Sequence, residues 1–97
     1  VTLEEAAIPV RPAVASACEL LGFDPLYVAN EGRLIAIVAA GSAGAALAAL
    51  RAHPLGREGQ RVGLVEAGPP GRVRLHTPLG TTRVVEMLSG EMLPRIC

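Results

Sequence analysis

The 97-residue chain carries nine basic and nine acidic side chains, a formal net charge of zero and a hydrophobic fraction of 51%. This length and composition suit one domain with a single apolar core and exclude a disordered protein. Charges of both signs are interspersed, so we expect no partner among nucleic acids and no binding to membranes. The longest apolar run, 34–40, is far shorter than the ~20 residues of a membrane helix, and we expect a cytoplasmic protein.

Residues 2–9 are predicted to be a linker, because Pro9 ends whatever helix the capping spacing of Thr2 and Glu5 begins. A helix is then predicted from Pro12, a favourable first residue, to Gly22, a favourable residue just past a helix end. The residues that recur at helical spacing on one face of this helix are Val14, Ala17, Cys18 and Leu21. Cys18 is therefore predicted to lie in the core.

Two runs rich in β-forming residues, 26–29 and 33–40, predict a hairpin closed by Asn30, Glu31 and Gly32. The second run is apolar at successive positions, so it should be a central strand covered on both faces. Glu31 lies at the predicted tip of the hairpin. From the residues alone, a solvated turn carboxylate is the favoured interpretation of Glu31.

A second helix follows Ser42, the predicted N-cap, with Ala43, Ala46, Leu47 and Leu50 at helical spacing. His53 and Pro54 end it, and the ring of His53 should contact the last helical carbonyls. His53 and His76 are far apart and no CxxC or HxxxH spacing occurs, so no metal site is predicted.

Three strands complete the predicted domain, at 61–67, 72–77 and 81–86. Gly63 within the first of them indicates a bulge or a close backbone approach. In the second, Arg72, Arg74 and His76 share the solvated face. The order of elements predicts an α+β fold with helices packed on one main mixed or antiparallel β-sheet, formed by residues 1–90.

Residues 91–97 are predicted to form an extended, flexible C-terminal arm that ends on Cys97. Pro94 biases the residue before it away from the helical region. Leu93 and Ile96 would supply apolar anchors, and Arg95 would favour the thiolate of Cys97, whereas the terminal carboxylate would oppose it. The residues alone leave open whether this segment is a working arm or a frayed tail.

Four blocks of the sequence resemble HypE-type hydrogenase maturation factors, and together they cover most of the chain. They are Leu93-Pro94-Arg95-Ile96-Cys97, residues 21–32, residues 53–56 and residues 70–73. The chain begins with Val1 and resembles only the C-terminal half of such a factor, without its N-terminal ATP-binding domain. The resemblance implies the C-terminal fold of the aminoimidazole ribonucleotide synthetase and selenophosphate synthetase superfamily.

The resemblance implies an ATP-dependent carbamoyl dehydratase in the full-length protein. Cys97 would accept a carbamoyl group and carry it as a thiocyanate, which supplies cyanide ligands to the iron of NiFe hydrogenase, with Glu31 as a base. ATP and Mg²⁺ would bind the N-terminal domain, so the fragment alone should bind neither and be inactive. The implied partners are a carbamoyltransferase, an iron-carrying scaffold complex and a second copy in a homodimer.

Two alternatives of another class remain. The first is a non-catalytic α+β interaction module whose thiols, Cys18 and Cys97, form a redox pair, which requires their Cα atoms to lie within about 7 Å. The second is a small-molecule regulatory domain that dimerises through exposed strands. A carbamoyl adduct on Cys97 would distinguish the dehydratase from both.

Overall fold

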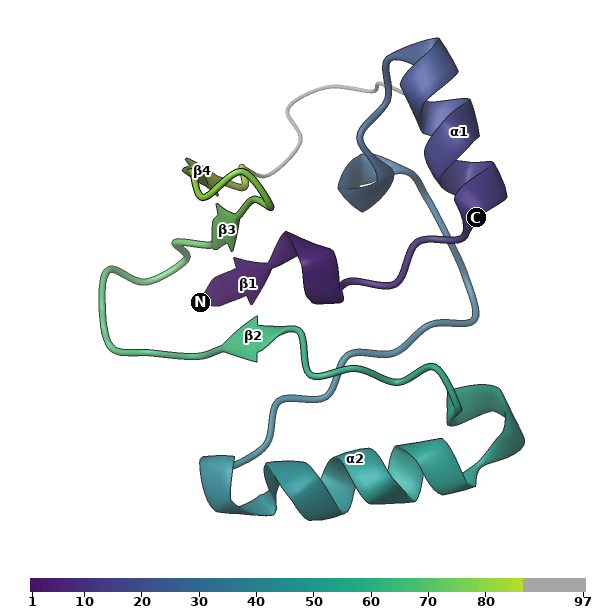
Figure 1. Ribbon diagram of the computed structural model, residues 1–97. Helices are drawn as coiled ribbons and strands as arrows, with labels where there is room; N and C mark the ends of the chain where they lie inside the picture. The colour runs from purple at the N-terminus through teal and green to yellow at the C-terminus, as the bar shows by residue number, and fades with distance from the viewer. Residues whose placement is uncertain (87–97) are drawn as a thin grey trace. The chain divides into compact units, whose positions relative to one another are not determined.

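The structure, a computed structural model, describes residues 1–86 (Figure 1). The chain divides into two compact units. The first comprises Val1–Pro9 and Ala36–Val85, and the second comprises Val10–Ile35 together with Glu86 among the described residues. The predicted arm, 91–97, lies outside the described residues.

The first unit contains a mixed four-stranded sheet in the order β2-β1-β3-β4. The strands are β1 (Thr2–Glu4), β2 (Gly63–Leu64), β3 (Arg74–His76) and β4 (Thr82–Val84). The β1 strand pairs antiparallel with β2 and parallel with β3, and β3 pairs antiparallel with β4. The predicted strands at 61–67, 72–77 and 81–86 are thus present but shorter, and the predicted α+β class with a mixed main sheet is confirmed.

The two faces of this sheet differ because side chains alternate along each strand. Leu3 and Leu75 are register partners on one face, and Leu75 is fully buried. Thr2 and Arg74 face each other on the opposite side, as do Glu4 and His76. Where β2 meets β1, a Cβ on Gly63 would contact the carbonyl oxygen of Thr2, which confirms the predicted close backbone approach.

The prediction of a linker at the start of the chain is wrong for residues 2–4. They form β1, which lies between β2 and β3 rather than at an edge of the sheet (Figure 1). A three-residue strand carries almost no periodic signal of its own, and β1 is specified by two partners more than 55 positions away in the sequence. A short 3₁₀ turn, Glu5–Ala7, follows it.

Both predicted helices form. In the second unit, α1 (Pro12–Leu21) begins at Pro12 and ends at Gly22, whose φ of 71° is left-handed. In the first unit, α2 (Ala43–Ala52) has Ser42 at its N-cap, although the hydroxyl makes no capping hydrogen bond. His53 ends α2, but its ring differs from expectation, because Nδ1 accepts a hydrogen bond from the Leu55 N–H at 3.1 Å.

The predicted hairpin at 26–29 and 33–40 is wrong. Pro25–Tyr27 is a 3₁₀ turn, capped by Asp24, whose side chain accepts a hydrogen bond from the Leu26 N–H at 3.0 Å. No strand is assigned between residues 28 and 39. The boundary between the two units falls inside the second run, after Ile35, which is 88% exposed instead of covered on both faces.

None of the helices formed by residues 1–86 is long and apolar enough to cross a membrane.

Candidate functional site

The candidate site is built around the loop that carries Glu31, in the second unit. Glu31 is exposed, and it makes no hydrogen bond or ion pair with any other part of residues 1–86. The adjacent Gly32 has a φ of 72°, a left-handed conformation that glycine adopts without steric cost. On the other side, the Asn30 amide donates to the carbonyl oxygen of Val28 at 3.1 Å. Glu31 is thus held by a locally ordered loop with its carboxylate open to solvent.

The segment just before this loop is fixed by two kinds of contact. Its 3₁₀ turn begins at Pro25 and is capped by Asp24. The hydroxyl of Tyr27 then donates a hydrogen bond to the carbonyl oxygen of Glu86 at 2.7 Å and accepts one from the Glu86 N–H at 3.0 Å. Tyr27 therefore links the Glu31 loop to the last described residue of the chain.

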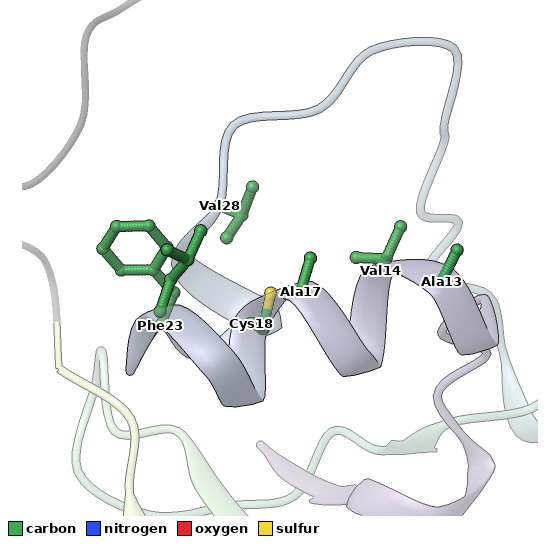
Figure 2. A pocket seen from close by; sticks show the side chains of 7 residues that line it. Ala13, Val14, Ala17, Cys18, Phe23 and Val28 are labelled. Carbon is green, nitrogen blue, oxygen red and sulfur yellow. The ribbon is translucent and has the colours of Figure 1, made fainter.

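An apolar hollow of about 390 Å³ lies along α1 in the same unit. Figure 2 shows the side chains of Val14 and Ala17 rising from one face of the helix into it, with Phe23 and Val28 at one end. Val28 belongs to the segment that leads to Glu31. The hollow thus continues from the predicted apolar face of α1 to the start of the candidate loop.

Cys18 also lines this hollow, and it is 5% exposed with a free thiol. The prediction that Cys18 lies in the core is confirmed. The other predicted site residues, Cys97 and its arm neighbours, lie outside the described residues. They are Leu93, Pro94, Arg95 and Ile96.

A polar cluster that the sequence did not predict lies on the exposed face of the sheet in the first unit. The Arg74 guanidinium contacts Glu66 at 2.9 Å and Thr2 Oγ1 at 3.3 Å. The hydrogen bond from Thr2, and then that from Arg74, lower the pKa of the Glu66 carboxyl. Nearby, His76 Nδ1 and Glu4 Oε1 are 2.9 Å apart. The sequence placed Arg74 and His76 on one solvated strand face, but their partners Thr2 and Glu4 alternate on a strand that the sequence analysis had taken for a linker.

Residues 1–86 contain no group of three or more His, Cys, Asp and Glu side chains that could hold a metal ion. His76 pairs with Glu4, and the ring of His53 caps a turn.

Comparison with known proteins gives consistent matches. The family described as AIR synthase related protein, C-terminal domain, matches residues 1–76. A protein of Cupriavidus necator named carbamoyl dehydratase HypE is 62% identical over 95 residues, which are 98% of this chain and 27% of that protein. The chain therefore belongs to the family of AIR synthase related C-terminal domains, and its resemblance to HypE-type hydrogenase maturation factors is confirmed.

Two solved structures add what those relatives bind. A hydrogenase maturation protein HypE in complex with ATP superposes with a TM-score of 0.89 at 45% identity, over 99% of this chain and 30% of that one. A HypE–HypF complex matches with a TM-score of 0.81 at 34% identity, over 88% of this chain and 27% of that one. The chain spans 27% of the length of its Cupriavidus necator relative, so these matches concern about a quarter of a longer protein.

Proposed function

We propose that this chain is the C-terminal part of a carbamoyl dehydratase of hydrogenase maturation, and that the thiol of Cys97 carries the reacting carbon. One observation carries the proposal, the 62% identity to a protein named carbamoyl dehydratase HypE over 98% of the chain. A HypE from Escherichia coli matches over all 97 residues, including the arm, at 45% identity.

The proposed chemistry has two stages. In the first, a carbamoyltransferase partner transfers a carbamoyl group from its activated donor to the sulfur of Cys97: the S–C bond forms, the bond from the carbamoyl carbon to the donor's leaving oxygen breaks, and that oxygen takes the electron pair while the thiol proton is released. In the second, the carbamoyl oxygen attacks the γ-phosphorus of ATP and displaces ADP. Phosphate then leaves with that oxygen, the nitrogen loses its protons, and the carbon and nitrogen become the S-cyano group. Water is formally removed, and its oxygen leaves on phosphate.

Glu31 is proposed as the base toward the carbamoyl nitrogen in the second stage. Its carboxylate is exposed and has no hydrogen-bond partner within residues 1–86, so it is available to accept a proton. A general base must come within hydrogen-bonding distance of the proton that it removes. The arm must therefore bring the carbamoylated sulfur of Cys97 to the Glu31 loop.

The other components of the proposed reaction are assigned outside this chain. Residues 1–86 contain no group of three or more His, Cys, Asp and Glu side chains that could hold a metal ion. ATP and Mg²⁺ are proposed to bind the part of the full-length protein that precedes this chain, in agreement with the HypE–ATP complex. The HypE–HypF complex supports a partner protein for the first stage. An iron-carrying scaffold complex would take the cyanide, and the full-length protein would act as a cytoplasmic homodimer.

The test is intact-mass analysis of the full-length protein after incubation with carbamoyl phosphate, ATP and the transferase. We expect a carbamoyl adduct that is converted into an adduct lighter by one water. Both adducts should be absent from Cys97→Ala, because the substitution removes the sulfur atom that is proposed to carry them. Wild-type protein that gains no adduct, or Cys97→Ala that gains the same adducts, would contradict the proposal.

The same experiment tests the role of Glu31. In Glu31→Gln the carbamoyl adduct should form at the wild-type rate, whereas its conversion should slow by roughly 100-fold or more, the usual contribution of a general base. Glu19→Gln is the matched control, since Glu19 is an exposed carboxylate on α1. An unchanged conversion rate in Glu31→Gln would remove Glu31 from the mechanism and leave the role of Cys97 intact.

A further inference from the structure

Tyr27, the one tyrosine of the chain, makes two hydrogen bonds to the backbone of a single residue 59 positions away. Its hydroxyl donates to the Glu86 carbonyl oxygen at 2.7 Å and accepts from the Glu86 N–H at 3.0 Å. A phenolic hydroxyl offers one proton and can accept others, so this one group satisfies both polar atoms of the Glu86 backbone. The pair of bonds fixes the position and the orientation of that residue.

Tyr27 itself is well anchored. It ends the 3₁₀ turn that Asp24 caps, and its side chain is half-buried. The next residue, Val28, lines the apolar hollow on α1 (Figure 2). Glu31 follows Tyr27 by four residues, which span at most about 13 Å at about 3.3 Å per residue. The group that holds Glu86 and the proposed base therefore belong to one short segment within one compact unit.

Glu86 immediately precedes the eleven residues, 87–97, that lead to Cys97. Eleven extended residues reach at most about 36 Å, so the place where this length starts limits which sites can lie within reach of the thiol. A start held at Glu86 puts the Tyr27–Glu31 segment within that limit. Reaction between two groups tethered in one molecule speeds up as the tether confines them.

We propose that Tyr27 is a positioning residue for the dehydration step: by holding the Glu86 backbone, it fixes the origin of the C-terminal segment relative to Glu31. The inference rests on the proposed roles of Cys97 and Glu31. It does not make Tyr27 a catalytic residue, because its hydroxyl touches Glu86 and no reacting atom. Its effect is confined to the step that requires Cys97 to meet a site on its own molecule.

Because Tyr27 is proposed to act only in dehydration, its loss should affect the rate of that step and not the rate of loading. A transferase in solution approaches the thiol by diffusion, so loading of Cys97 does not need a fixed origin. Dehydration does need one, because Glu31 belongs to the same molecule as the thiol and lies on the segment that holds Glu86. Loss of the Tyr27 hydroxyl should therefore slow dehydration and leave both loading and the KM for ATP unchanged. A merely structural role would slow loading and dehydration together and would also change the KM for ATP.

The experiment compares wild type with Tyr27→Phe in the full-length protein. The change keeps the half-buried ring and removes only the hydroxyl. Cys97 is first carbamoylated by the transferase, and dehydration is then followed by intact mass in a single turnover at saturating ATP. We expect the dehydration rate to fall about tenfold, as for the loss of one or two hydrogen bonds, with loading and the KM for ATP within twofold of wild type.

Thr81→Val is the matched control, because it also removes a hydroxyl that makes a hydrogen bond, here to Thr77 Oγ1 at 2.6 Å in the β3–β4 turn. It should change neither step. A second measurement does not depend on activity: amide hydrogen exchange at Glu86 should accelerate in Tyr27→Phe and stay unchanged in Thr81→Val, since only the first loses the acceptor of that N–H.

The outcomes separate this inference from the proposed function. Wild-type exchange at Glu86 in Tyr27→Phe, or an equal loss of loading and dehydration together with a lower unfolding midpoint, would overturn the positioning role. If wild type itself forms no S-cyano adduct, the proposed function fails and the positioning role fails with it. In that case the exchange at Glu86 still shows whether the hydroxyl holds the backbone.

Discussion

Glu66 is the residue whose ionisation is most clearly shaped by its neighbours among residues 1–86. Its carboxylate accepts hydrogen bonds from Thr2 Oγ1 and from the Arg74 guanidinium, and these lower its pKa. A pKa that is lower in the folded than in the unfolded state adds stability above the unfolded value, about 4.3 for Glu. That contribution is lost as the pH falls through the lower, folded pKa.

We therefore expect Glu66→Gln to unfold at a lower temperature than wild type at pH 7, because the charged acceptor is gone. The difference should shrink below about pH 4.3 and vanish below the folded pKa, where wild type is also uncharged. Thermal unfolding at several pH values measures it. Glu58→Gln is the control, because Glu58 has no partner within the described residues. A difference that is independent of pH would contradict the electrostatic origin.

Among the candidate-site residues, the features set by neighbouring residues in the sequence could be predicted, whereas a contact between distant residues could not. Cys18 could be placed in the core because its helical spacing is local information, and the structure buries it at 5% exposure. Gly32 was likewise recognisable as a residue that tolerates the positive φ found there, although the hairpin predicted around it did not form. The pairing of Tyr27 with Glu86 was not predictable, because it joins residues 59 positions apart and neither carries a motif.

At the scale of elements, the helices were predicted from local chemistry. Proline at the start and glycine at the end mark α1 in the sequence, and the structure uses both. The hairpin failed because β-pairing depends on a distant partner: the runs at 26–29 and 33–40 have the composition of strands, but Asp24 and Pro25 turn the first into a 3₁₀ helix. The β1 strand was missed because its three residues carry no recognisable strand pattern, and its pairing with β2 and β3 specifies it.

Gly22 and Gly44 give a matched test of this local control. A Cβ would meet nothing within 4 Å at either position, but Gly22 has a φ of 71° and Gly44 lies within α2. We expect Gly22→Ala to destabilise the protein by about 1 kcal/mol because alanine strains at positive φ. Gly44→Ala should stabilise it by about 0.5 kcal/mol through better helix propensity. Denaturant unfolding measures the change in the free energy of unfolding for both variants. Equal changes of the same sign would show that the backbone conformation of the two glycines does not cause the difference.

At the scale of the whole molecule, the α+β class followed from the order of elements, whereas the function did not follow from geometry. Balanced charge argued against nucleic acids and membranes as partners, but it named no substrate. The matching blocks of sequence indicated the reaction. The structure contributes the placement of Glu31 and its connection through Tyr27 to Glu86, while the placement of Cys97 falls outside residues 1–86.

The two proposed stages make different demands on the molecule, and this yields a test on the 97-residue chain itself. In the proposed scheme, loading requires the thiol, the transferase and the carbamoyl donor that the transferase uses, whereas dehydration would also require ATP held by the rest of the full-length protein. We expect the separate chain to accept a carbamoyl group on Cys97 and to stop there, with no S-cyano adduct and no ADP release. Full-length protein under the same conditions should proceed to the S-cyano adduct.

Intact mass and an ADP assay follow the two stages, and Cys97→Ala in the separate chain is the control for loading at another site. If the separate chain released ADP at the full-length rate, the ATP site would have to lie within these 97 residues, and the assignment of ATP to the preceding part would be wrong. If full-length protein loaded with carbamoyl but the separate chain did not, the transferase would have to recognise more than the arm, because Cys97 and the residues around it are identical in both.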